Sequence, residues 1–280
     1  MKKISFPNTS EWINRCFDFL TDKVSSKVLS VGNCFARIGL AGLFVIAVLS
    51  IVFSFVLVAR YGMPVISGIL FSILSVFWCV FLHYVAFTML PALNTLIKNA
   101  PTKMSSAGVL KVMALFVGVV GVFALLYGIY SSFVTFRTEL MGIMLIETSN
   151  VFFVGLFLFV LCEFWLFLLL KPSELNVEIV EKTSVGQEFI GLTSFFAKGC
   201  LKLTPVVFGT SISFAVLCLL RMLFDTDVLF EQMQMLIYLC LSAFLPLLVY
   251  IAFLSYFFAL DIVTAVLKLP EKLDKISSEK

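Results

Sequence analysis

The chain contains six long stretches in which apolar residues follow one another with almost no charge. The stretches are Ile38–Ala59, Tyr61–Ile97, Val112–Phe136, Thr148–Leu170, Leu203–Leu220 and Gln232–Leu260. A helix needs about 20 apolar residues to cross the hydrocarbon core of a bilayer. Because backbone N–H and C=O groups cannot stay unpaired in lipid, each stretch is expected to form a helix. The alternating pattern of a membrane β-barrel strand is absent from the sequence.

This pattern predicts an all-α fold, a polytopic integral membrane bundle of six transmembrane helices arranged as three hairpins. The expected segments are a cytoplasmic amphipathic segment at 1–37, transmembrane hairpins at 38–97, 112–170 and 203–260, a cytoplasmic loop at 98–111, a cytoplasmic amphipathic loop at 171–202 and a cytoplasmic tail at 261–280. Apolar residues recur every three or four positions in the two amphipathic segments. Such a helix lies in the headgroup plane, or packs on cytoplasmic loops or a partner protein.

The positions of Lys and Arg predict which loops face the cytoplasm. The segment to Arg37, the 98–111 loop, the 171–202 loop and the tail after Asp261 together hold 17 of the 20 basic residues. Only three basic residues fall on the other side. Since cytoplasmic loops are enriched in Lys and Arg, both termini are expected in the cytoplasm. A cleavable signal peptide is not expected, and a bacterial inner membrane is the favoured location.

The composition excludes several classes of protein. Apolar and aromatic residues make up 61% of the 280 residues, and charged residues only 13%, whereas a soluble domain carries about 25% charge. This inventory cannot cover a water-soluble surface, so a soluble enzyme, a nucleic-acid binder and a disordered chain are excluded. The net charge of +3 is too small to indicate a polyanionic partner.

The charge spacing suggests an internal repeat. Arg37 and Arg60 are 23 residues apart, and so are Lys198 and Arg221. The middle hairpin departs from this spacing. Duplicated hairpins are common in membrane proteins, although apolar helices also come to resemble one another through composition alone.

Two stripes of small residues are expected to matter for helix packing. On the third predicted helix, Gly118, Gly121 and Gly128 recur at helical spacing and predict a packing seam, because small residues let helices approach closely in lipid. On the second helix, a candidate polar stripe contains Ser72, Ser75 and Cys79. This stripe predicts either another seam or the lining of a solute path.

Two ionisable residues lie well inside the predicted spans, namely His83 and Glu163. The local pattern around them recurs near Ser255, so the three residues are a candidate intramembrane polar cluster. Intramembrane charges usually face protein or water, and such a cluster would let a proton or ion pause. The alternative is that Glu163 reaches the interface and His83 bonds to a backbone carbonyl.

Three arginines are expected on the outer side, and one proline is expected to bend a helix. Arg60, Arg137 and Arg221 each end the first helix of a hairpin, as anchors favoured by the helix dipole or as a ring of positive charge. Pro246 lies inside the sixth predicted helix and is expected to kink it.

The sequence contains no recognisable catalytic or metal-binding motif. It has one histidine and seven cysteines without CxxC spacing, and it lacks HExxH, GxGxxG and phosphate-loop patterns. No enzyme activity, cofactor or metal is expected. The favoured function is a non-enzymatic membrane subunit, a scaffold or anchor in a larger envelope assembly. The alternative is a channel or transporter for a small or lipophilic solute. Expected partners are the lipid bilayer and membrane proteins or further copies of this chain, not nucleic acid.

Overall fold

Long helices dominate the computed structural model, which describes residues 15, 18–20, 25–138, 145–224, 237 and 241–267. In chain order its elements are α2 (Ser25–Tyr61), α3 (Val65–Asn99), β1 (Thr102–Met104), α4 (Ala107–Thr138), α5 (Leu145–Leu170), the short 3-10 helix η1 (Pro172–Leu175), β2 (Val177–Ile179), α6 (Val185–Phe224) and α8 (Leu245–Leu267). Within the described ranges, six helices are long and apolar enough to cross a membrane. The prediction of a polytopic bundle of six such helices is confirmed.

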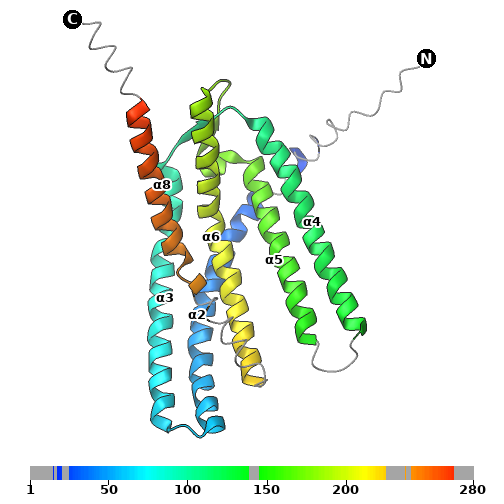
Figure 1. Cartoon of the computed structure of the whole chain (residues 1–280), viewed down its shortest axis with the longest axis vertical. Helices are drawn as coiled ribbons and strands as arrows, with labels where there is room; N and C mark the ends of the chain where they lie inside the picture. The colour runs from blue at the N-terminus through cyan, green and yellow to red at the C-terminus, as the bar shows by residue number, and fades with distance from the viewer. Residues whose placement is uncertain are drawn as a thin grey trace, which may run out of the picture.

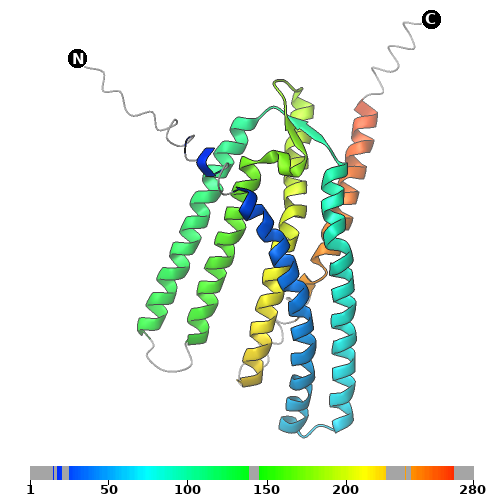
Figure 2. The same ribbon diagram turned by 180° about the vertical axis from the view of Figure 1, so that it is seen from behind.

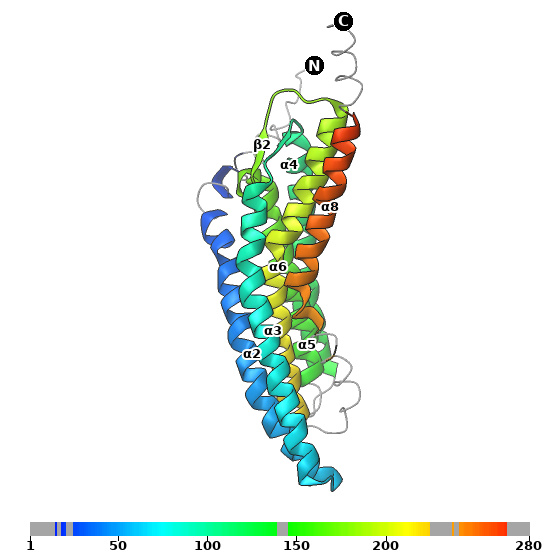
Figure 3. The same cartoon turned by 90° about the vertical axis from the view of Figure 1, so that its left-hand side faces the viewer.

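Successive helices run in opposite directions along one common axis (Figure 1). The strands and η1 lie together at one end of the bundle, here named the capped end, and the opposite end is the far end. Helices α4 and α5 pack closely on each other and diverge from α6 toward the far end (Figures 1 and 2). Helix α2 crosses in front of α6, and α8 lies beside α3 and α6 (Figures 2 and 3).

Several helices extend beyond the predicted spans. Helix α6 has 40 residues, so it measures about 60 Å at 1.5 Å per residue, roughly twice the hydrocarbon thickness. The expected boundary between a loop ending at 202 and a span beginning at 203 therefore lies inside one continuous helix. Helix α2 likewise begins at Ser25, before Arg37, and α8 continues past Asp261 to Leu267. Charged residues mark the edge of the lipid, but they do not stop a helix.

The bend predicted at Pro246 stays a prediction. Helix α8 begins at Leu245, and the chain makes a turn at Ala243 and Phe244 just before it. Pro246 therefore lies in the first turn of α8, where a missing backbone N–H costs no helical hydrogen bond. The sixth apolar stretch is interrupted before the proline.

A small parallel sheet interrupts the all-α pattern. Strand β1 pairs with β2 so that Thr102 lies opposite Val177 and Met104 opposite Ile179. The two strands come from connections that sequence analysis treats as separate cytoplasmic loops. Their pairing binds the α3–α4 connection to the α5–α6 connection at the capped end.

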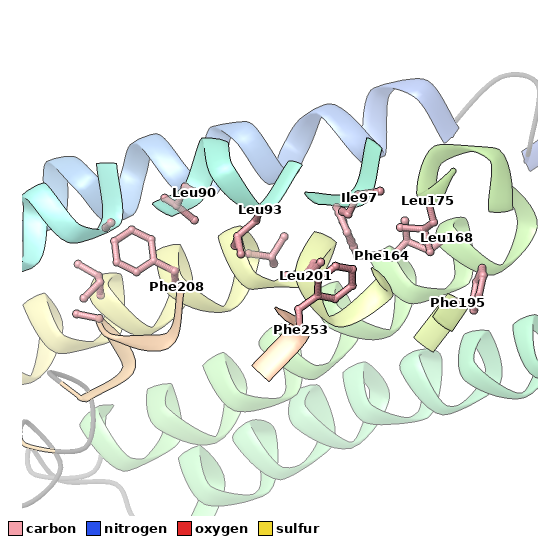
Figure 4. Packing of buried hydrophobic residues seen from close by; sticks show 14 of the residues in the cluster. Leu90, Leu93, Ile97, Phe164, Leu168, Leu175, Phe195, Leu201, Phe208 and Phe253 are labelled. Carbon is pink, nitrogen blue, oxygen red and sulfur yellow. The ribbon is translucent and has the colours of Figure 1, made fainter. Parts of the chain in front are cut away.

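A cluster of buried apolar side chains runs along the bundle and takes residues from all six long helices (Figure 4). Phe164, Phe195 and Phe208 are fully buried there, and Leu93 of α3 packs with them. Helix α6 is the central element, because half of the residues in its most apolar segment are buried, compared with 6% in α8. The outward faces of α3 and α4 expose large apolar side chains, as expected for helices surrounded by lipid.

Candidate functional site

The capped end is held together by a carboxylate that joins α6 to the start of α4. Glu188, in the first turn of α6, accepts hydrogen bonds from the backbone N–H groups of Ser105 at 2.6 Å and Ser106 at 2.8 Å. The hydroxyl of Thr183 also donates to it, at 2.5 Å. These N–H groups lie directly before α4. At the start of a helix the backbone N–H groups have no acceptor within the helix, and the helix dipole favours a negative charge there. Glu188 thus caps α4 from a distant part of the chain.

Lys198 joins α6 to strand β1 and to Asn176, the residue that precedes β2. Its side chain is fully buried, and its Nζ donates to the Thr102 hydroxyl at 2.7 Å and to the Asn176 carbonyl at 3.1 Å. Among the described residues, no carboxylate lies within ion-pair distance of this ammonium group. Burying a charge without an opposite charge is costly, so the two oxygen acceptors are the groups that hold Lys198 in place.

Asn176 closes the end of α3. It adopts a left-handed backbone conformation with φ of 53°, which asparagine tolerates better than most residues. Its side-chain N–H donates to the Lys98 carbonyl at 2.8 Å. One of the last carbonyls of α3 is therefore satisfied by a residue that also accepts the bond from Lys198.

Two glycines let α6 approach its neighbours at this end. A Cβ atom on Gly191 would lie 2.5 Å from the Lys103 carbonyl oxygen of β1. A Cβ atom on Gly199 would overlap the ring of Trp165 from α5. That ring stacks on Phe195, with centroids 6.2 Å apart. Helix α6 can contact both β1 and α5 only because these positions lack side chains.

A polar cleft of about 560 Å³ opens beside this capped end. It is lined by Gly32, Asn33, Asn94, Ile97, Lys98, Phe164, Ser173, Glu174, Asn176, Lys202 and Pro205. Lys202 is half-buried, and its Nζ donates to the Asn94 side-chain oxygen at 3.4 Å. Glu174 forms an ion pair with Lys171 at 3.4 Å. The cleft therefore combines two lysines with several amide groups, and its single carboxylate already has a cationic partner.

An apolar groove of about 320 Å³ lies between α5 and α6, next to α2. It is lined by Phe35, Phe153, Val154, Leu156, Phe157, Val160, Thr210, Ser211, Ser213, Phe214 and Leu217. The hydroxyls of Thr210 and Ser213 donate to carbonyls of their own helix, at Val206 and Gly209. The groove therefore presents mainly hydrocarbon.

His83 packs against α2 rather than in a shared polar cluster. Its Nδ1 lies 3.3 Å from the Leu40 carbonyl oxygen, and its ring lies 4.4 Å from that of Phe44. This is the carbonyl contact that sequence analysis gives as the alternative.

Glu163 and Ser255 face other neighbours. The Glu163 carboxylate approaches Gly121 on α4, whereas Ser255 is exposed and donates to the Ile251 carbonyl of its own helix at 3.0 Å. In the described part of the chain, no hydrogen bond or ion pair joins His83, Glu163 and Ser255 to one another. The proposed convergence is therefore not formed by these contacts. The convergence of the three residues stays a prediction.

The predicted polar stripe on α3 lies against α2. Ser50 of α2 donates to the Ser75 hydroxyl at 3.0 Å, and Ser72 donates to the Gly68 carbonyl at 2.8 Å. Ser72 and Cys79 are both buried. The arrangement is that of a helix–helix contact.

The glycines of α4 lie on the face that meets α5. A Cβ atom on Gly155 of α5 would lie 2.8 Å from the Cα atom of Gly128. A Cβ atom on Gly121 would lie 2.8 Å from the Cβ of Cys162, and Gly118 faces Leu166. The two backbones touch along this seam, as expected where small residues face each other.

The three outer arginines lie at the far end, on α2, α4 and α6. Arg60 is exposed in the last turn of α2. The side chains of Arg137 and Arg221 lie outside the described part of the structure.

The capped end is the feature that sequence reasoning missed. The sequence pattern uses Lys198 for orientation and repeat spacing and Lys202 for orientation, and it singles out neither Glu188 nor Asn176. The signals were local, namely a lysine directly after the Phe195–Ala197 segment and glycines beside aromatic residues on α6.

The described side chains show no metal-binding arrangement, and five of the seven cysteines fall in the described ranges without a disulfide between them.

Comparison of the chain with known protein families, curated proteins and solved structures finds no match.

Proposed function

We propose that this chain is a non-enzymatic integral membrane subunit, a scaffold or anchor within a larger membrane or envelope assembly. The observation that supports this role is how the polar side chains inside the spans are used. The hydroxyls of Ser54, Ser132 and Thr204 each donate to the carbonyl four residues earlier in their own helix, and His83 lies against a carbonyl of α2. Polar groups used in this way favour a framework over a hydrophilic path.

The outer surface supports assembly with other membrane helices. Only 6% of the residues in the most apolar segment of α8 are buried. Helix α4 exposes Phe116, Phe123 and Tyr130 along the face away from α5. Lipid tails cover such faces, and so do the helices of a membrane partner or a further copy of this chain. The rigid capped end would then present a fixed surface outside the bilayer.

The proposed orientation places the capped end in the cytoplasm. Among the described basic residues, Lys98, Lys103, Lys171 and Lys182 lie in or beside its connections, whereas Arg60 lies at the far end. An excess of Lys and Arg marks the cytoplasmic side. Both termini would be cytoplasmic, and a bacterial inner membrane remains the proposed location.

Isolation in a mild detergent tests the scaffold role. The full chain carrying an affinity tag should retain a membrane partner, or a second copy of itself, in fixed stoichiometry after size-exclusion chromatography. Reconstituted into liposomes, the purified chain should produce no solute flux. A chain that remains a monomer without partners and carries flux would contradict the proposal.

A second function, transport of a small or lipophilic solute, is favoured by the apolar groove between α5 and α6. A Thr210→Val variant changes a groove-lining hydroxyl, and Thr264→Val is a matched control because both hydroxyls donate to the carbonyl four residues earlier. Transport through the groove predicts altered flux in Thr210→Val alone. Glu163→Gln tests the carboxylate separately: a changed pH dependence of flux in a folded variant would support transport.

A further inference from the structure

The polar cleft at the capped end holds two lysines that lack anionic partners within the described structure. Lys202 donates a hydrogen bond to the neutral side chain of Asn94, and Lys98 is exposed at the last turn of α3. The single carboxylate of the lining, Glu174, is already paired with Lys171. The lining thus carries more positive than negative charge, and its remaining polar groups include the amide side chains of Asn33 and Asn94.

The composition of α3 changes next to the cleft. Phe87 and Tyr84, which precede Asn94 on α3, are strongly exposed, at 63% and 68%. From Asn94 onward the helix becomes polar and ends at Asn99. The change from exposed aromatic to polar side chains along one helix is typical of the boundary between lipid tails and headgroups. This change in composition predicts headgroup depth for the two lysines.

The floor of the cleft is apolar. Ile97, Phe164 and Pro205 contribute to the lining, and the first two are buried members of the main core. A volume of about 560 Å³ falls in the range of small-molecule sites, roughly 300–1,000 Å³. A ligand with a negative polar group above an apolar portion would satisfy both the rim and the floor.

We infer that this cleft binds the phosphate-bearing headgroup of an anionic phospholipid. Lys98 and Lys202 neutralise the phosphate, and the amides of Asn33 and Asn94 offer hydrogen bonds. The first carbons of the acyl chains lie against the apolar lining residues before the chains enter the surrounding bilayer. The ligand is a lipid rather than a soluble phosphate because the cleft lies at the membrane boundary, where anionic lipids are concentrated. This inference does not depend on the scaffold role.

Thermal unfolding of the full chain in detergent, with added lipid, tests the inference. Phosphatidylglycerol should raise the unfolding temperature, and phosphatidylcholine should not. The double variant Lys98→Gln, Lys202→Gln should bind phosphatidylglycerol about tenfold or more weakly, because each cation near an anionic surface contributes measurably. The matched control Lys103→Gln, Lys182→Gln removes two exposed lysines outside the cleft lining and should bind like wild type.

Equal binding by the cleft variant and wild type would overturn the inference. An equal loss of phosphatidylglycerol binding in the control variant would also overturn the inference, because the attraction of the lipid to lysines would then be a general property of the surface. Glycerol phosphate that stabilises the chain as well as the lipid does would overturn the lipid assignment. If the double variant fails to fold, Asn33→Asp adds an opposing charge at an exposed lining residue, and it should weaken phosphatidylglycerol binding. Unchanged binding by Asn33→Asp would overturn the inference.

Discussion

The Glu188 carboxylate accepts a hydrogen bond from the Ser106 backbone N–H at 2.8 Å, although 82 residues separate them along the chain. In most helices the residue that caps the N-terminus comes directly before the first turn. Here the cap of α4 is supplied by the first turn of α6. Correct placement of one helix start therefore depends on correct placement of the other, and the two connections at the capped end are formed as a unit.

Removal of this carboxylate should destabilise the capped end. Glu188→Ala leaves the N–H groups of Ser105 and Ser106 without their acceptor, and a lost cap costs about 1–2 kcal/mol. Glu188→Gln keeps one oxygen acceptor and should cost less. Thermal unfolding in detergent measures both variants against wild type. An Ala variant as stable as the wild-type chain would show that water replaces the carboxylate without loss.

The seam between α4 and α5 should tolerate no side chain at its closest point. Gly155→Leu places a large group against Gly128 and the Ala124 carbonyl, and overpacking of this kind costs about 1–3 kcal/mol or more. The expected result is a lower unfolding temperature and separation of the two helices.

A matched control for the seam is Gly108→Ala in the first turn of α4. Nothing lies within 4 Å of a Cβ atom built at Gly108, and alanine favours a helix over glycine by about 0.5–1 kcal/mol. This variant should be as stable as wild type or slightly more stable. If Gly155→Leu behaved in the same way, the close contact of α4 and α5 would be contradicted.

The sequence predicted those features that depend on local pattern. Hydrophobic length located the six helices, and small-residue spacing placed Gly121 and Gly128 on one face of α4. The internal repeat stays a prediction. By contrast, β1 and β2 have three residues each, too few to produce a pattern, and their pairing depends on contacts between distant connections.

Lys198 shows why the candidate site was harder to predict. A lysine at the edge of an apolar stretch is normally solvated, so the sequence gives no reason to expect its burial. Its burial depends on three separate segments. Lys198 lies on α6, and its two acceptors are Thr102 of β1 and Asn176, which ends η1 in a left-handed conformation. No property of α6 alone indicates that these acceptors will be present.

Lys198 itself yields a prediction that separates packing from charge. Lys198→Ala removes both hydrogen bonds and leaves a cavity under the sheet, so it should lower stability by about 2–5 kcal/mol. Lys198→Met fills most of the same volume without an unpaired charge, and it should be clearly less destabilising. Denaturant or thermal unfolding of both variants gives the comparison. Equal losses would mean that the hydrogen bonds to Thr102 and Asn176, rather than volume, hold the capped end.

Chemical labelling should place the capped end and the far end on opposite sides of the membrane. Glu181 is exposed in the α5–α6 connection, and Tyr61, which is 57% exposed, ends α2 at the far end. In a chain whose own cysteines are replaced, Glu181→Cys and Tyr61→Cys carry the single thiols. A membrane-impermeant thiol reagent added to intact cells should label position 61 only, and lysis should expose position 181. Labelling of both positions in intact cells would contradict a membrane-spanning bundle, whereas labelling of position 181 alone would reverse its orientation.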